Sequence, residues 1–270
     1  MTRAAILLLV PATLWAADPD AIELGRKSMP VVAANSAKAR RYAFREYYVN
    51  RQVDAKGKET DRATETWDVI GLEGSLYRRL ILRNDKPLSA KEQRREDQRQ
   101  ADEAERRRKE TPEQRRNRLF SFTYSYRLPY ERLMEIFDLR YIGEKESEGR
   151  RCYLLEVTPK ADFQPSTDND KETVNYKFVF WLEAENYYPA RIDGEIIGEH
   201  SRMQKGTTFT VVDQRLSDGT WAPKTNTIHF AVRFMKVHTV HGEAVRTYSD
   251  FHKFQADSTI QFTDKIEQWH

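Results

Sequence analysis

Histidine is the residue whose spacing in this sequence comes nearest to that of a metal site. His238 and His241 are the closest pair among the six histidines, and they lie near an expected turn at Gly242. On a strand, residues three apart point to opposite faces. No Cys or acidic cluster joins the pair at the spacing of a zinc site. The sequence therefore predicts no metal site.

Four carboxylates flank the expected turn at Tyr187-Tyr188-Pro189, where they could supply the acid pair of a glycoside hydrolase. Such a pair must face one cleft, about 5 to 10 Å apart, whereas carboxylates on a hairpin usually face water. We therefore interpret them as surface groups rather than catalysts. The four residues are Glu183, Glu185, Asp193 and Glu195.

Signatures of other catalytic classes are missing from the sequence. There is no G-x-S-x-G elbow for a serine nucleophile, and neither a GxGxxG fingerprint nor a P-loop. The single cysteine, Cys152, lies in the segment RCYLLEV, where it fits as a small apolar filler of a strand. We predict that the protein is not an enzyme and that it needs no cofactor.

Aromatic and aliphatic residues at alternate positions are the dominant pattern of the chain. The longest example is Gly206–Lys236, in which two alternating segments join at Ser217-Asp218-Gly219. A period of two indicates strands with one apolar face. Such faces can close over a core or line a hydrophobic cavity, and both alternatives stay open here. If a cavity exists, its candidate ligand-binding residues are Tyr153, Leu155, Tyr176, Phe178, Phe180, Ile228, Phe230, Val232 and Phe234.

The remaining elements predict a fold that is mainly β (α+β). An Ala-rich helix over 20–39, with Pro30 splitting or kinking it, precedes a three-strand meander over 41–53, 60–70 and 75–83. About ten strands follow one another, mostly as neighbours, and include one over Phe120–Tyr126 and a last one over Val245–Phe254. We expect a single strongly curved antiparallel sheet forming a half-open barrel, with a helical lid at 129–137.

A charged segment interrupts these strands. Ser89–Arg118 has almost no apolar side chains, contains many helix formers, and places acids and bases three and four residues apart. This pattern predicts a solvated helical insertion. Alternatively, its basic stretch Arg106–Lys109 could bind anionic lipid or an envelope protein, although both signs of charge are interspersed and no apolar stripe supports docking on a membrane.

The first residues have the layout of a secretory signal peptide. Arg3 precedes the apolar run Ala4–Val10, and small residues follow at Ala16 and Ala17. We expect a signal peptide at 1–16 and one domain at 17–270. The run is too short to span a bilayer, and no cysteine stands at the cleavage point, so we expect a soluble periplasmic protein without an acyl anchor. The net charge of +3 and the export signal make nucleic acid an unsuitable partner.

Several strand and turn signatures resemble the LolA/LolB-like lipoprotein-carrier superfamily, in its branch of outer membrane lipoprotein-sorting proteins. They are Trp181-Leu182-Glu183, Pro189 with Arg191, Asp218-Gly219-Thr220-Trp221-x-Pro223 and Tyr248-x-x-Phe251. The resemblance covers about Asp20 to Gln261 and implies a half-open barrel whose hydrophobic cavity shields acyl chains. It therefore implies a soluble periplasmic carrier of a lipid or lipoprotein acyl chain. A regulatory or protein-interaction module acting through residues 89–118 is the alternative.

Overall fold

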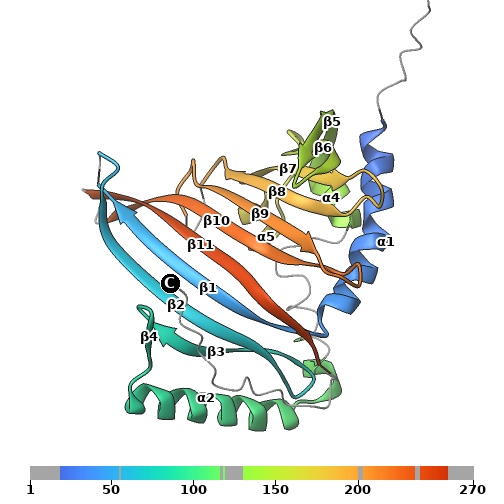
Figure 1. The fold of residues 1–270 in the computed structure, drawn as a ribbon. Helices are drawn as coiled ribbons and strands as arrows, with labels where there is room; N and C mark the ends of the chain where they lie inside the picture. Colours follow the sequence, from blue (N-terminus) through green and yellow to red (C-terminus); the bar gives the residue numbers. More distant parts are fainter. Residues whose placement is uncertain are drawn as a thin grey trace, which may run out of the picture.

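Most of the chain forms one continuous antiparallel sheet. The structure is a computed structural model that describes residues 19–54, 56–115, 118, 130–199, 203–234 and 238–254. Within these ranges eleven strands pair in the order β4-β3-β2-β1-β11-β10-β9-β8-β7-β6-β5. The sheet is strongly twisted and curved, and its two edge strands do not pair with each other (Figure 1). The predicted fold class, a mainly β half-open barrel, is confirmed. The predicted signal peptide and the predicted strand Phe120–Tyr126 lie outside the described residues.

The strands are β1 Tyr42–Val53, β2 Glu59–Leu72, β3 Ser75–Arg83, β4 Lys86–Pro87, β5 Phe137–Ser147, β6 Arg150–Pro159, β7 Tyr176–Glu183, β8 Pro189–Ile196, β9 Thr208–Arg215, β10 Trp221–Phe234 and β11 His238–Lys253. The helices are α1 Ala21–Ala39, α2 Ala90–Arg108, α4 Tyr130–Ile136 and α5 Asp168–Thr173. The short helix α5 was not expected. It begins with a capping box in which Thr167 and Asp170 satisfy each other's backbone N–H groups.

Helix α1 begins at Asp20, whose side chain accepts a hydrogen bond of 2.9 Å from the backbone N–H of Ile22. The helix is continuous across Pro30, so the split considered for this position does not occur. Its apolar side chains pack on the sheet at two places. Leu24 contacts Leu155 and Leu182, and Val31 and Val32 lie against a core that includes Trp221.

Strand β11 is longer than the sequence predicted, and this corrects the turn expected at Gly242. Gly242 lies inside β11, paired with Gln52 of β1 and Phe230 of β10. A Cβ atom there would lie 2.5 Å from Cζ of Phe230 and 2.6 Å from the carbonyl oxygen of Arg51. The glycine is needed for this close packing rather than for a turn. The last described strand, β11, pairs with β10 on one side and with β1 on the other. Its pairing with β1 is the one in this sheet that joins strands distant in sequence.

The charged helix α2 lies along β3, which the two-residue edge strand β4 pairs with only at Leu82 and Arg83 (Figure 1). Ala104 packs on Ile70, Leu72 and Tyr77, and is the buried residue of the helix. Polar side chains of α2 then bond to the backbone groups on the outer side of β3. The N–H of Leu80 donates to Glu96 over 3.2 Å, and Arg99 donates to the carbonyl of Arg78 over 2.7 Å.

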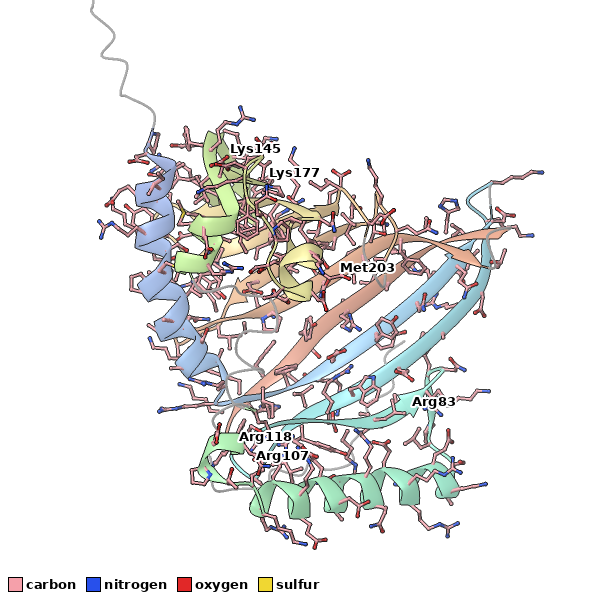
Figure 2. All side chains as sticks on the ribbon, turned by 180° about the vertical axis from the view of Figure 1, so that it is seen from behind. Arg83, Arg107, Arg118, Lys145, Lys177 and Met203 are labelled. Atoms are coloured by element: carbon pink, nitrogen blue, oxygen red, sulfur yellow. The ribbon has the colours of Figure 1, made fainter. Side chains whose placement is uncertain are left out.

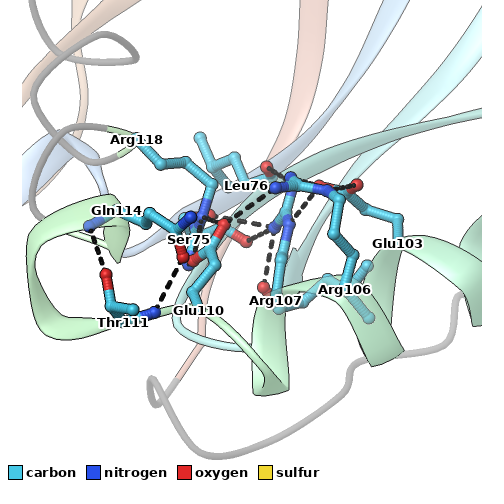
Figure 3. Close-up of polar contacts among 10 residues, drawn as sticks. Ser75, Leu76, Glu103, Arg106, Arg107, Glu110, Thr111, Gln114 and Arg118 are labelled. Carbon is cyan, nitrogen blue, oxygen red and sulfur yellow. Dashed lines mark hydrogen bonds and ion pairs between the residues drawn. The ribbon is translucent and has the colours of Figure 1, made fainter.

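Arg107 completes this edge contact. Its guanidinium donates to the carbonyl oxygens of Leu72 at 2.8 Å, Ser75 at 3.2 Å and Leu76 at 3.2 Å, and it is held by Glu103 (Figure 3). An uncovered edge strand is a template for pairing with another chain. The insertion therefore has a structural role, because it satisfies the backbone of β3.

No helix in the described parts of the chain is long and apolar enough to cross a membrane.

Candidate binding face

One face of the sheet carries the predicted ligand-binding residues, and we call it the inner face. Directly paired residues of neighbouring strands lie on the same face, so the register defines two adjacent rows across the sheet. The first is Leu139, Val157, Phe178, Gly194, Phe209, Ile228, Ala244 and Asn50. The second is Tyr141, Leu155, Phe180, Ile192, Val211, Asn226, Arg246, Tyr48 and Glu65.

Helices cover the end of the inner face that β5, β6 and β7 form. Helix α4 places Ile136 in a fully buried cluster with Phe137 and Val157. Helix α1 places Leu24 against Leu155, which is 1% exposed. Helices α1, α4 and α5 all lie toward this end of the sheet (Figures 1 and 2). This end is a closed hydrophobic core.

The adjoining strands carry aromatic rings that are only partly buried. Phe178 and Phe180 lie 5.8 Å apart between ring centroids, and Tyr176 stacks on Phe178 at 5.6 Å. Phe209 of β9 meets both Tyr176 and Phe178 edge-on, at 6.2 and 6.1 Å. All four are intermediate in exposure. We call Tyr176, Phe178, Phe180 and Phe209 the aromatic cluster.

Gly194 of β8 makes this cluster continuous across three strands. It stands between Phe178 and Phe209 in the first row. A Cβ atom at Gly194 would lie 2.1 Å from Cζ of Phe209, so the ring occupies the space above the glycine. Without that space Phe209 could not reach over β8 toward Phe178.

The predicted binding residues thus separate into groups. Leu155 belongs to the closed core, and Tyr153 packs at its margin while stacking on Tyr187 at 6.3 Å. Tyr176, Phe178 and Phe180 form most of the aromatic cluster. Ile228 and Phe230 follow on β10 and are half-buried. Val232 and Phe234 continue β10, but the structure does not describe their side chains.

Beyond β10 the inner face carries charged residues among aromatic ones such as Tyr48 and Trp67. Glu46 of β1 is 5% exposed, and its Oε1 accepts hydrogen bonds from Arg78 at 2.6 Å and from Arg246 at 3.1 Å. Arg78 lies over the ring of Trp67 at 4.5 Å, and Arg246 lies over the ring of Tyr48 at 4.7 Å. We call Glu46, Arg78 and Arg246 the charged triad.

Of the residues considered for catalysis, Glu185 and Glu195 are exposed surface groups, whereas Cys152, Glu183 and Asp193 occupy structural positions. Cys152 is fully buried, and burial raises the pKa of its thiol. Glu183 is 3% exposed and accepts from the N–H of Asn186. Asp193 faces outward, where it pairs with Arg191 and accepts from Trp181 at 2.8 Å. Among the described residues, no group of three or more His, Cys, Asp or Glu side chains could hold a metal ion.

The sequence interpretation missed two parts of the inner face. Phe209 stands in the alternating segment Thr208–Val211, so its period was visible, but the segment was treated only as the first arm of a hairpin. Glu46 interrupts the aromatic series Tyr42, Phe44 and Tyr48 at the same period. An acid at an apolar position was the available signal. Its partners Arg78 and Arg246 could not be found from spacing, because they lie on β3 and β11.

No protein-family profile matches the chain, and no curated protein matches it. An outer membrane lipoprotein-sorting protein domain from Vibrio parahaemolyticus is similar in structure, with a TM-score of 0.38, 13% identity, and coverage of 85% of this chain and 93% of that one.

Two further solved structures are similar. For a LolA superfamily protein from Nitrosomonas europaea, the TM-score is 0.34 and the identity 11%, over 88% of this chain and 96% of that one. For MucB in complex with MucA from Pseudomonas aeruginosa, the TM-score is 0.27 and the identity 11%, over 84% and 94%.

Proposed function

We propose that the protein is an exported periplasmic carrier or binding protein that holds an acyl chain of a lipid or lipoprotein on its inner face. The observation that carries the proposal is the aromatic cluster. Four large rings adjoin a fully buried core, yet they remain half-buried on a face that the described helices cover only at one end. Burying a Phe-sized side chain fully is worth about 1.5 to 3 kcal/mol, so completing the burial of one half-buried ring stabilises a complex by roughly half of that.

The position of the cluster suits a long apolar ligand. Along the first row, Phe178, Phe209 and Ile228 lie on β7, β9 and β10, so the surface crosses several strands. Strands lie about 4.8 Å apart, and an acyl chain lying across them would meet rings and aliphatic groups throughout. The signal-peptide layout at 1–16 supports export to the periplasm.

Lipid uptake provides the test. Native mass spectrometry of the protein purified from cells should reveal a bound lipid, and a fluorescent fatty acid should bind to the delipidated protein. Phe209→Ala should weaken that binding, by up to about tenfold, since it removes a ring-sized contact. The control is Trp181→Ala, which removes an aromatic from the outer face beside Phe180. Absence of both copurified lipid and fatty-acid uptake would reject the proposal.

A second candidate is an envelope protein-interaction module acting through residues 89–118. One observation favours it: a hollow of about 640 Å³ along α2 is lined by Tyr77, Arg95, Gln98, Arg99, Asp102, Glu103 and Arg106. Tyr77 is 6% exposed, and its hydroxyl has no hydrogen-bond partner in the part of the chain that the structure describes. Because deleting the insertion would uncover β3, the suitable variant is Arg95→Glu, on an exposed side chain. Loss of a cross-linked envelope partner with fatty-acid uptake intact would favour this module.

A further inference from the structure

The charged triad lies on the inner face rather than on the outer surface, and its charges do not cancel. One carboxylate of Glu46 is shared by two guanidinium groups, so the three groups together carry one excess positive charge. The side chain of Glu46 is 6% exposed, whereas those of Arg78 and Arg246 are 43% and 30% exposed. The buried acid therefore anchors two arginines whose outer parts remain accessible.

Each arginine is fixed in orientation as well as in position. Arg78 lies over Trp67 and Arg246 over Tyr48, while Glu46 holds one nitrogen of each guanidinium. A guanidinium offers five N–H donors in one plane, which suits two-point binding of a phosphate or carboxylate. Arg78 uses Nη2 and Arg246 uses Nε toward Glu46, so other donors of both groups can reach an anion.

Two buried acceptors without partners flank Arg246. Oδ1 of Asn226 and Oδ1 of Asn50 are both buried and make no hydrogen bond. Asn226 is paired directly with Arg246 across β10 and β11, and Asn50 is paired with Ala244, two residues before Arg246 on β11. Buried polar groups in proteins are almost always satisfied. The two oxygens find no donor among the described residues, but neither is accessible to a ligand, so the accessible groups beside them are the guanidinium groups of Arg78 and Arg246.

The charged triad is also continuous with the apolar part of the inner face. Asn226 and Ile228 are alternate residues of β10, and Ile228 is paired with Phe209 of the aromatic cluster. Paired side chains on one face lie about 5 Å apart. A single ligand could thus place an apolar chain on Phe209 and Ile228 and a polar end beside Arg246.

We propose that the charged triad is the head-group site of an amphiphile whose head carries a negative charge. Arg78 and Arg246 bind the anionic oxygens of the head, and Glu46 holds both arginines in place. This inference rests on the proposed function for the binding of the acyl chain. The head-group site adds the chemical class of the ligand's head. If the triad served folding alone, the charge of the head would not change affinity.

Calorimetric titration with three amphiphiles of equal chain length tests the site. Lauroyl lysophosphatidylglycerol has charge and hydroxyls, lauric acid has charge alone, and monolaurin has hydroxyls alone. We expect the wild-type protein to bind the lysophospholipid at least about tenfold more tightly than monolaurin, because charge-assisted hydrogen bonds are stronger than neutral ones. Lauric acid should also bind more tightly than monolaurin, because its carboxylate can bind the same two arginines.

Variants assign the preference to the triad. Arg246→Gln leaves the pair of Arg78 with Glu46 and should remove most of the preference for charged heads, with monolaurin affinity within about twofold of wild type. Arg246→Lys keeps the charge and should keep part of the preference, which also serves if the glutamine variant folds poorly. The matched control is Arg191→Gln, because Arg191 is also stacked on an aromatic ring and paired with an acid, but on the outer face.

The outcomes separate this inference from the proposed function. If wild-type protein binds none of the three amphiphiles, the proposed function itself fails. If it binds monolaurin and the charged amphiphiles equally well, the acyl site stands and the head-group site is rejected. An equal loss of preference in Arg191→Gln and Arg246→Gln would also reject the head-group site, since it would reflect net charge.

Discussion

The side chain of Asn35 pairs with the backbone of Trp221 in both directions. Nδ2 of Asn35 donates to the carbonyl oxygen of Trp221 over 2.9 Å, and the N–H of Trp221 donates to Oδ1 of Asn35 over 2.7 Å. Both residues are buried, at 8% and 3% exposure. An amide side chain of α1 thereby completes the hydrogen bonding of the first residue of β10 and fixes the helix on the sheet.

Asn35→Ala should lower the free energy of unfolding by about 1 to 3 kcal/mol, because it leaves two buried backbone groups of Trp221 without partners. Urea unfolding followed by far-UV circular dichroism would measure it. Asn169→Ala, at an exposed position of α5, is the control and should change stability by no more than about 0.5 kcal/mol. Equal effects of the two substitutions would contradict the role of Asn35.

Gly194→Ala should lower stability by about 1 to 3 kcal/mol, because the new methyl group occupies the space of the Phe209 ring. The effect should depend on that ring. In a double-mutant cycle with Phe209→Ala, the cost of Gly194→Ala should largely disappear, a coupling of about 0.5 to 3 kcal/mol. Additive effects of the two substitutions would show that the glycine is needed for another reason.

Arg107→Ala should both destabilise the protein and promote association. It removes hydrogen bonds to three carbonyl oxygens of Leu72, Ser75 and Leu76, at a cost of about 1 to 3 kcal/mol, and opens the edge of β3. Unfolding curves and light scattering at increasing protein concentration measure the two effects. Arg108→Ala is the control, since the side chain of Arg108 is 62% exposed and forms an ion pair with Glu73 on the surface. Aggregation of the control alone would oppose this account of the edge.

Acid should weaken the attachment of α2. Hydrogen bonds from Arg106, together with Arg107, lower the pKa of Glu103 from its ordinary value of 4.5 to about 2. Because the folded-state pKa is depressed, the stabilisation is fully present above pH 4.5 and is lost as the pH falls toward 2. Wild type should therefore exceed Glu103→Gln in melting temperature at pH 6, and the difference should shrink between pH 4.5 and 2.

A matched control for this pH dependence is Glu105→Gln, because Glu105 is largely exposed and pairs with Lys109 on the same turn of helix. The effect of Glu105→Gln on the melting temperature should be small at every pH from 6 to 2, because exposed ion pairs contribute about 0 to 1 kcal/mol. A difference between wild type and Glu103→Gln that stays constant down to pH 2 would refute the assignment.

Local patterns were sufficient to predict most elements of this fold. Alternation located the strands around Tyr176, Phe178 and Phe180, and the charge spacing of 89–118 located α2. The sequence does not predict which strand α2 packs on. Its contacts with β3 run from arginine side chains to backbone carbonyl oxygens, and every strand has such oxygens. The extent of β11 was misjudged because glycine usually marks a turn, whereas Gly242 accommodates the Phe230 ring.

The sequence likewise does not predict which part of the inner face is a closed core and which part carries half-buried rings. Leu155 and Phe180 have the same period and are paired across two strands, yet Leu24 covers one and Phe180 remains half-buried. Whether a side chain of the inner face is covered depends on where α1 and α4 pack on the sheet. The period of two along a strand does not predict that position. The charged triad brings together residues up to 200 positions apart, which only the pairing of β1 with β11 reveals.

That pairing also determines the order in which the sheet can be assembled. Strands β1 to β4 and strands β5 to β10 each form by pairing neighbours in sequence, but β11 alone joins the two sets. Closing such a distant contact is slow, because the entropy of the intervening chain must be lost first. The joining strand is also the last of the eleven to be synthesised. A chain shortened before β11 should therefore yield two separate sheets of four and six strands, with the aromatic cluster on one and most of the charged triad on the other.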